Sequence, residues 1–466
     1  MSDFRPLRRL HLVGVFFFAL FLLPSILSAQ VTTGAMSGVV TSTEGEPLVG
    51  ATIIAIHEPT QTQYGAVVRE GGNFNISNMR IGGPYTVRVQ ILGYEDGQQA
   101  DVYVSLNQTV ATDFALIAEA IEVAGIQVIA EEDPVLNSHR TGAATYVTSD
   151  QVVELPSIRR STRDLSRLDP RSDGNFSFGG KNWLYNNISL DGSYFNNPFG
   201  LDDPAPGGQT ASEPVPFDAI EAVQVSIAPF DIRQSGFTGA AINSVTKSGT
   251  NKFKGTAYTF TRNESFIGDK VSGSDVLNPD LSFNQSGFSL GGPLAKDQAF
   301  FFVNYERIRR DDPGSNFVAA RPGSSGPFVS RVQASDLEAI SERLFDSYGY
   351  VTGPFEGYIH ETNSDKFLGK LDWNVNDNNH FIFRYTGLRA DRALPPHPFA
   401  ISINNTGRGP NENSLPFQNS GYAINNKLDS YVWELNTQAE GYANRLFASY
   451  NRFRRRRSPA SGTGRC

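Results

Sequence analysis

Histidines beside acidic residues are the first places in this chain where residue types and spacing could support catalysis. His57 is followed by Glu58, and His360 is followed by Glu361. A zinc hydrolase needs two histidines and a carboxylate at ligand spacing, and neither pair has the second histidine of H-E-x-x-H. No glutamate lies three residues after His57 or His360, and none lies three residues after His139, His380 or His397. The sequence therefore predicts no enzyme, no catalytic residue and no metal ligand, and we expect these histidines at the surface or in loops.

Turns that contain glycine or aspartate could be ligand loops, but none fits such a motif. Gly179-Gly180-Lys181-Asn182 has the Gly-Lys pair of a phosphate loop, but Asn175 stands where that motif needs a glycine, and no Ser or Thr follows the lysine. Asp191-Gly192 and Asp377-Asn378 lack the further oxygen ligands of a calcium loop. We interpret all of them as turns and predict no cofactor.

Aromatic residues in the same region could stack on a sugar or a peptide. These candidate substrate contacts are Trp183, Tyr185, Tyr194 and Phe195. Aromatic side chains carry a large apolar surface, so a place in the core of a domain is the alternative for each of them. The pattern does not identify the substrate.

The composition favours a β-rich protein. The 466 residues include 44 glycines, 17 tyrosines and 33 phenylalanines, and 19% of them are charged. That charged share is below the roughly 25% of soluble domains, yet no stretch beyond the N-terminus is apolar enough for a membrane helix, which leaves a β-barrel as the membrane-compatible structure. The net charge of −8 argues against nucleic acid as a partner, and the single cysteine, Cys466, excludes a disulfide framework within the chain.

Residues 1–29 are predicted to be a cleaved signal peptide. Arg5, Arg8 and Arg9 precede the apolar run Leu12–Leu27, and the small residues Ser28-Ala29 follow it. An uncleaved membrane anchor is the alternative, but the run is shorter than the ~20 residues of a membrane span. The pattern predicts export from the cytoplasm.

Residues 30–118 are predicted to form a small β-sandwich. Residues 51–56 and 85–91 alternate side chains with a period of two, and turn sequences such as Gly82-Gly83-Pro84 separate these runs. The stretches SGVVTSTEGEPLVGATI at 37–53 and GGNFNISNMRIGGPYTVRVQILGY at 71–94 resemble the carboxypeptidase regulatory-like domain. That module occurs in many secreted proteins, so by itself it implies little about function.

Residues 119–137 are predicted to be an acidic linker with one strand-like segment. Its extended, β-prone residues are Ile126, Gln127, Val128, Ile129 and Ala130, and Pro134 closes the run. The segment is either a strand that a partner could bind or the last strand of the preceding sandwich.

The pattern changes twice after the linker. Residues 138–250 are mixed, with a short helix expected over 163–168 and strands over 222–227 and 240–245. From residue 251 the chain alternates strands and turns. Residues 366–373 and 381–386, for example, place apolar and aromatic side chains on one face and mostly polar ones on the other. This alternation is typical of transmembrane barrel strands, although soluble sheets alternate too.

Several stretches carry a family resemblance. They are LPSIRRSTRDLSRLDPR at 155–171, GKNWLYNNISLDGSYFNNPFGL at 180–201, residues 214–264, and FSLGGPLAKDQAFFFVNYE at 288–306. In this order they resemble the plug domain and first barrel strands of Oar-like TonB-dependent receptors of the Gram-negative outer membrane. The resemblance implies a mainly β chain with an N-terminal β-sandwich, a mixed α/β plug domain over 138–250 and a transmembrane antiparallel β-barrel from 251 onward.

The resemblance also implies a mechanism and partners. The plug domain would block a barrel of about 22 strands, and TonB would capture a periplasmic strand by β-strand addition. The segment 126–130 is then the candidate TonB-contacting strand, with outer-membrane lipid and an unidentified substrate as the other partners. A cell-surface adhesion or signalling protein on the same scaffold, without transport, is one alternative. A soluble secreted β protein is the other.

The end of the chain departs from that family pattern. Only 216 residues follow Thr250, too few for about 22 strands, so we expect an incomplete barrel. The run Arg454-Arg455-Arg456-Arg457 and the residues after it show no strand alternation. We therefore expect the strand pattern to stop after about residue 453, in a tail that is frameshifted or prematurely stopped, with a functional basic tail as the alternative.

Overall fold

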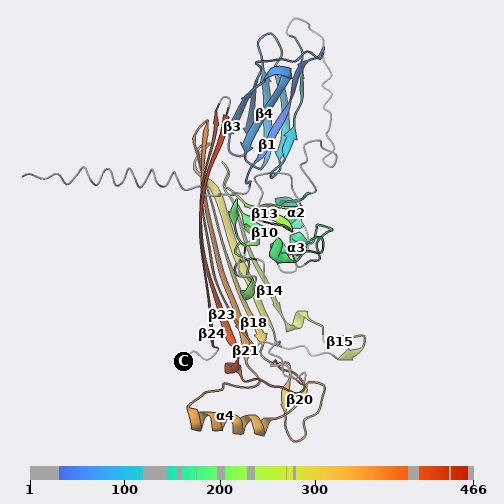
Figure 1. Ribbon diagram of the computed structural model, residues 1–466, viewed down its shortest axis with the longest axis vertical. Helices are drawn as coiled ribbons and strands as arrows, with labels where there is room; N and C mark the ends of the chain where they lie inside the picture. The colour runs from blue at the N-terminus through green and yellow to red at the C-terminus, as the bar shows by residue number, and fades with distance from the viewer. Residues whose placement is uncertain are drawn as a thin grey trace, which may run out of the picture.

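The computed structural model describes residues 31–118, 144–154, 160–174, 176–196, 205–227, 237–268, 270–275, 280–396, 409–439 and 442–459. The predicted signal peptide and the candidate strand 126–130 lie outside these residues. A β-sandwich lies at one end of the long axis, the plug domain lies in the middle beside a tall curved sheet, and loops with one helix lie at the other end (Figure 1).

The sandwich consists of two four-stranded sheets. One contains β1 (Gly34–Ser42), β4 (Asn73–Met79), β7 (Thr109–Ala111) and β8 (Phe114–Leu116), and the other contains β2 (Thr52–His57), β3 (Thr62–Val67), β5 (Gly82–Gln90) and β6 (Gly97–Val104). The short 3-10 helix η1 (Glu70–Gly72) leads into β4. Alternate residues such as Met36, Ile53, Ile76 and Val87 are fully buried between the sheets, so the period-two pattern has produced one closed core.

His57 lies in this core, so the expectation that it is a surface or loop histidine was wrong. Its side chain follows Ile53 and Ala55 on the inward face of β2 and is only 4% exposed. Its Nδ1 lies 2.6 Å from the hydroxyl of Thr60, and its ring packs 4.9 Å from that of Tyr85. Strand alternation, which places every second side chain inside, decides its position.

Acidification is expected to destabilise the sandwich through His57. Burial and then the charge of Arg80 lower the pKa of His57 well below its ordinary value of 6.5, so the folded domain keeps the ring neutral. The unfolded chain binds a proton below that value. The contribution of the neutral His57 ring to the free energy of unfolding is therefore fully present above pH 6.5. It is lost as the pH falls below 6.5, by up to about 1.4 kcal/mol per pH unit. Urea unfolding of residues 31–118 at neutral and acid pH measures this loss. The His57→Gln variant should show a shallower pH dependence, and an unchanged dependence would contradict this assignment.

The plug domain is a five-stranded mixed sheet with short helices in the segments that connect its strands. The sheet order is β11 (Ser193–Tyr194), β10 (Asn187–Leu190), β13 (Ala240–Thr246), β12 (Ile220–Ile227) and β9 (Ala144–Thr148). The helices are α2 (Ser149–Glu154), α3 (Thr162–Ser166), η2 (Trp183–Tyr185), η3 (Gly208–Thr210) and η4 (Phe217–Ala219). The helix predicted over 163–168 and the strands predicted over 222–227 and 240–245 are therefore present, with boundaries shifted by a few residues.

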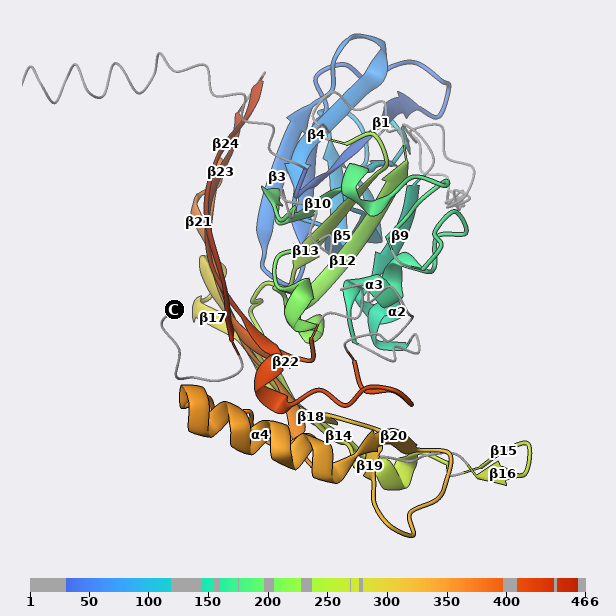
Figure 2. The same cartoon turned by 60° about the horizontal axis from the view of Figure 1, so that its bottom comes forward.

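The tall sheet has seven antiparallel strands in chain order. They are β14 (Lys254–Asn263), β17 (Ser282–Ala295), β18 (Ala299–Pro313), β21 (Ile359–Asn376), β22 (Asn379–Leu394), β23 (Tyr422–Ala439) and β24 (Tyr442–Pro459). Within the described residues β14 pairs only with β17 and β24 only with β23, so this part of the sheet does not close into a barrel. Figure 2 shows the sheet curving around the plug domain.

The two faces of this sheet differ in the way that the sequence predicted. In β21, Ser364, Lys366 and Leu368 are buried on the concave face toward the plug domain, whereas Phe367 and Trp373 on the opposite face are 42% and 43% exposed. An outward apolar face and an inward polar face are expected of strands with lipid outside and a lumen inside. We call these faces outward and inward below.

The predicted end of the strand pattern at about residue 453 differs from the structure. β24 continues to Pro459, and its last residues pair with β23 up to Tyr422. Backbone hydrogen bonds carry this pairing and do not require apolar side chains. Burial also still alternates, because Phe453 and Arg455 are half-buried while Arg454 and Arg456 are exposed. Arginine on both faces hid this alternation in the sequence.

Gly249 lies where the chain passes from the plug domain to the tall sheet. A Cβ at this position would lie 2.3 Å from the carbonyl oxygen of Phe301 and 2.8 Å from that of Gly292. Any side chain would therefore displace the crossing segment, and glycine lets the chain cross closely over β17 and β18.

The remaining elements lie in the connections at the far end of the tall sheet. They are η5 (Glu264–Phe266), β15 (Lys270–Val271), β16 (Ser274–Asp275), β19 (Val318–Ala320), β20 (Val329–Gln333), α4 (Ala334–Tyr348) and η6 (Gln418–Ser420). A small core of Ala319, Ala334, Leu337 and Leu415 holds α4 against these loops. No helix in the described part of the chain is both long and apolar enough to span a membrane.

Candidate functional site at the plug–sheet interface

A buried ion pair joins the plug domain to the inward face of the tall sheet. Arg384 of β22 donates one Nη1 hydrogen bond to the carboxylate of Asp191 and another to the carbonyl oxygen of Leu190, both at 2.9 Å. The two charged side chains are 0% and 8% exposed. Asp191 lies in the tight turn between β10 and β11, and that turn presents its carboxylate to the sheet.

Further contacts keep Asp191 ionised. Burial alone would raise the pKa of this carboxyl. The positive charges of Lys370 and Arg384 oppose that effect, and so do hydrogen bonds from the backbone N–H and the hydroxyl of Thr246 at 2.8 and 2.7 Å. The net pKa lies below its ordinary value, so the contact is between full charges. A buried charge that loses its partner is costly, and the link therefore holds the two domains together.

Weaker polar contacts surround this pair. The hydroxyls of Ser212 and Ser364 are 2.6 Å apart, and the amides of Asn426 and Asn451 donate to the hydroxyls of Thr210 and Ser193 at 3.2 and 2.8 Å. Water can replace hydrogen bonds of this kind at small net cost. Most of this interface could therefore exchange its partners during a movement of the plug domain, whereas the ion pair could not do so cheaply.

Apolar contacts also connect the two parts. Phe302, Leu368, Leu388 and Leu428 on the inward face of the sheet are buried in the same cluster as the core of the plug domain. The plug domain thus depends on the sheet for part of its core.

The sandwich is attached to the near end of the same assembly. Arg80 pairs with Asp372 of β21 at 2.5 Å, and Asn374 donates a hydrogen bond to the hydroxyl of Thr62 at 2.9 Å. His380 of β22 packs its ring 5.2 Å from that of Tyr64, so this half-buried strand histidine also differs from the expected surface position. The sandwich, the plug domain and the sheet therefore share one set of contacts at this end.

The predicted aromatic contacts occupy different environments. Tyr185 is 56% exposed, whereas Phe195 is 2% exposed and lies under the guanidinium of Arg384 at 5.7 Å. Trp183 is partly buried against the core of the plug domain, and Tyr194 is half-buried in β11. The structure thus places Phe195 beside the ion pair. Of the four predicted residues, Tyr185 is the one whose side chain is mostly exposed to solvent.

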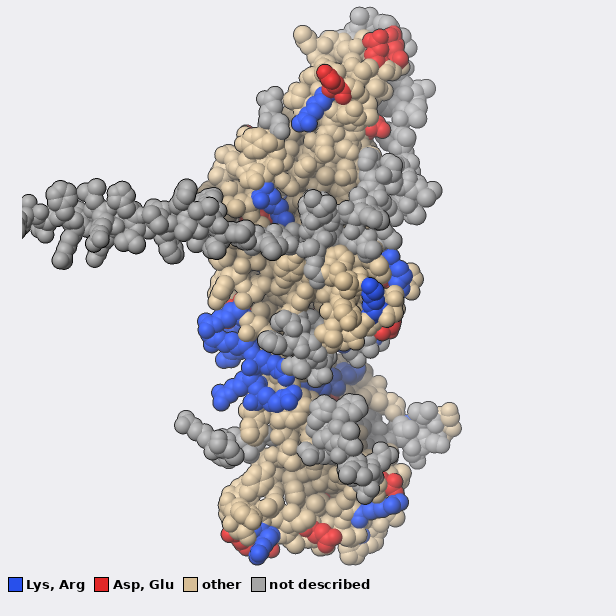
Figure 3. All heavy atoms as spheres, viewed as in Figure 1, with Lys and Arg blue, Asp and Glu red and all other residues tan. Residues whose placement is uncertain are grey.

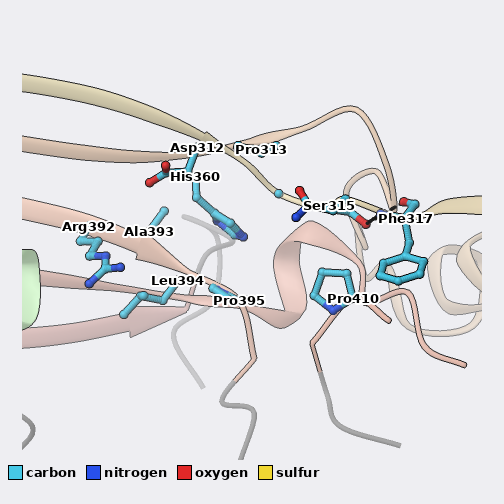
Figure 4. A pocket seen from close by; sticks show the side chains of 12 residues that line it. Asp312, Pro313, Ser315, Phe317, His360, Arg392, Ala393, Leu394, Pro395 and Pro410 are labelled. Atoms are coloured by element: carbon cyan, nitrogen blue, oxygen red, sulfur yellow. Dashed lines mark hydrogen bonds between the residues drawn. The ribbon is translucent and has the colours of Figure 1, made fainter. Parts of the chain in front are cut away.

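A pocket of about 280 Å³ lies away from these aromatic residues, at the far ends of β18, β21 and β22. Its charged or ionisable lining residues are Asp312, His360 and Arg392 (Figure 4). Arg310 already pairs with Asp312 at 2.7 Å, and the Nε2 of His360 is buried without a protein partner. His360 therefore also differs from the expected surface position. The pocket could hold a small polar molecule.

Several predicted features cannot be placed in the structure. The candidate TonB-contacting residues Ile126, Gln127, Val128, Ile129 and Ala130, together with His139 and His397, lie outside the described residues. Among the residues that are described, no three His, Cys, Asp or Glu side chains are grouped as metal ligands.

Sequence reasoning missed both partners of the ion pair. Asp191 was interpreted only as part of a tight turn, and Arg384 only as one polar residue of an alternating strand. Alternation did signal that Arg384 faces inward, because it lies between the aromatic residues Phe383 and Tyr385. Nothing local indicated its partner, which is 193 residues away in the sequence.

Two known families match parts of the chain. The outer membrane beta barrel domain matches residues 245–463, and the carboxypeptidase regulatory-like domain matches residues 35–117. The first match covers the tall sheet with its loops, and the second covers the two sheets of the sandwich.

Curated relatives match across these regions. The TonB-dependent transporter Oar of Myxococcus xanthus is 21% identical over 402 residues, which cover 82% of this chain and 35% of Oar. The probable TonB-dependent siderophore receptor PirA of Acinetobacter baumannii is 30% identical over 137 residues, which cover 27% of this chain and 17% of PirA. This chain thus spans about a third or less of the length of each relative.

Solved structures of outer-membrane proteins also align with the chain. The outer membrane transporter YddB from Escherichia coli aligns with a TM-score of 0.45 and 16% identity, over 66% of this chain and 38% of that one. The chain thus contains a carboxypeptidase regulatory-like domain and an outer membrane beta barrel domain, and over 82% of its length it is similar to the TonB-dependent transporter Oar.

Proposed function

We propose that this chain forms part of a transporter that takes up a substrate across the outer membrane with energy delivered by TonB. The observation that carries the proposal is the buried pair of Asp191 and Arg384, which holds the plug domain against the inward face of an outer-membrane sheet. A plug domain in this position obstructs the space that the sheet encloses, so passage of a substrate requires the plug domain to move.

The contacts around the pair suit such a movement. The ion pair and the buried Lys370, whose ammonium donates to the carbonyl oxygen of Thr246 at 3.0 Å, fix the resting position. The neutral hydrogen bonds of Ser212, Asn426 and Asn451 can be exchanged for water. A pull on the chain that precedes the plug domain would act on this interface. In the proposal, TonB captures the segment 126–130 as an added strand, because main-chain hydrogen bonds give affinity without a demanding sequence.

The substrate contacts are part of the same proposal. Tyr185, Trp183 and Tyr194 could meet a substrate at the surface of the plug domain. Phe195 is buried beside Arg384, so a substrate could reach it only after the plug domain has moved.

Deletion of residues 121–130 is expected to abolish binding of the chain to the periplasmic domain of TonB, measured by pull-down with the chain folded in detergent. The matched control removes ten residues, 340–349, from the end of α4 and its cap at the end of the molecule away from the sandwich, and it should bind TonB normally. Binding that survives the first deletion would reject 126–130 as the contact. Absence of TonB binding by the intact chain would instead favour a surface role without transport.

A further inference from the structure

The outward face of the tall sheet carries a row of aromatic rings. Tyr385, Tyr431 and Tyr450 lie on the neighbouring strands β22, β23 and β24, with ring centroids 5.0 and 6.4 Å apart. Tyr305 and Phe288 continue the row on β18 and β17 at 6.1 Å. Aromatic girdles of this kind mark the interface between the apolar band of a barrel and the lipid headgroups.

Charged residues begin directly beyond this girdle, on the side away from the sandwich. In β22, Tyr385 and Arg389 both bind Asp429 of the next strand, at 2.9 and 2.5 Å. The same arrangement occurs in β18, where Tyr305 and Arg309 bind Asp365 of β21 at 2.6 and 2.7 Å. In both places one aspartate offsets one arginine.

The charge is offset only in part on β23 and β24. Asp429 of β23 lies directly opposite Arg452 of β24, but it already binds Arg389. Lys427 lies directly opposite Arg389 on one side and Arg454 on the other, so three cations stand side by side across three strands. Arg452 and Arg456 lie two residues from Arg454 on the same face, and all five side chains are exposed. We call these five residues the outer basic row, and Figure 3 shows Lys and Arg side chains gathered over this part of the sheet.

Such a row is unfavourable without a partner. Like charges directly opposite each other on neighbouring strands destabilise a sheet. Among the described residues, no salt bridge involves Lys427, Arg454 or Arg456. A bound anion would remove this repulsion, and arginine suits phosphate because its planar guanidinium donates two parallel hydrogen bonds.

We propose that the outer basic row binds the phosphate groups of lipid in the outer leaflet of the outer membrane. The row faces away from the lumen and begins next to the aromatic girdle, so headgroups are what meets it in the membrane. The occupant is a phosphorylated lipid and not a transported substrate, because the inward face and the plug domain lie on the other side of the sheet. This binding is independent of uptake and of TonB.

The strand itself offers a matched test. Arg454→Gln with Arg456→Gln removes two charges from the outward face. Arg455→Gln with Arg457→Gln removes two charges from neighbouring positions on the inward face, where Arg457 lies over the ring of Tyr422 at 4.6 Å. The full chain is folded in neutral detergent micelles and titrated with diphosphoryl lipid A. At about 1 kcal/mol per surface cation, the outward variant should bind about 30-fold more weakly, and the inward variant should bind as the unmodified chain does.

Two further titrations separate lipid from free phosphate. Dephosphorylated lipid A should bind to the unmodified chain at least about 30-fold more weakly than diphosphoryl lipid A does, because it offers no phosphate to the row. Inorganic phosphate alone should compete only poorly. Equal weakening by the two variants would overturn the proposal, because it would reduce the effect to net charge. Undiminished binding of dephosphorylated lipid A would overturn it, and so would full competition by inorganic phosphate.

Discussion

Replacing Arg384 by methionine is expected to loosen the plug domain from the tall sheet by about 3–5 kcal/mol, the cost of leaving a buried charge without its partner. Asp191 would keep its hydrogen bonds from Thr246 and the nearby charge of Lys370 but lose the guanidinium that lies 2.9 Å away and binds it directly. The backbone N–H of Thr246 donates to Asp191, so hydrogen exchange of this amide in the folded chain reports the loosening directly. Exchange should accelerate by more than a hundredfold.

Arg389→Met is the matched control, since it removes the same side chain from the same strand on the outward face. Its partner Asp429 is 29% exposed, so water takes over the contact and the change should stay within about 1 kcal/mol. A double variant, Arg384→Met with Asp191→Asn, removes both buried charges and should recover much of the loss. Similar effects of Arg384→Met and Arg389→Met would contradict the role of the ion pair.

The second large effect is expected in the sandwich. Ile53→Ala should destabilise residues 31–118 by about 2–5 kcal/mol, because it leaves a cavity between two sheets that cannot close over it. Ile53 is completely buried, and a domain of this size has only about 5–10 kcal/mol of stability. Urea unfolding followed by circular dichroism measures the change in the free energy of unfolding.

Ile54→Ala is the control for this variant. Ile54 is the next residue of β2 and lies on the opposite face, where it is only half-buried. It should cost about 1 kcal/mol, in keeping with an ordinary substitution outside the core. If both variants lowered the stability equally, the two-sheet core would not be the main source of stability of this domain.

The sequence by itself determined most of the architecture. The alternation in residues 85–91 and in residues 366–373 assigned side chains correctly to the inside and outside of the sandwich and the tall sheet. Turn residues such as Gly82-Gly83-Pro84 separated the runs. This information is local, because successive side chains of a strand point to opposite faces whatever the rest of the chain does. The resemblance to Oar-like receptors added the order of the domains.

Only the tertiary structure decided which residues meet across domains. Asp191 and Arg384 are 193 residues apart, and Arg80 and Asp372 are 292 residues apart. Each pair depends on strand register and on how the domains dock, and a local sequence pattern contains no information about either of these. The burial of His57 and the extension of β24 through Arg454–Arg457 were missed for a related reason. A polar residue reveals neither the face on which it lies nor its backbone partner until the neighbouring strand is in place.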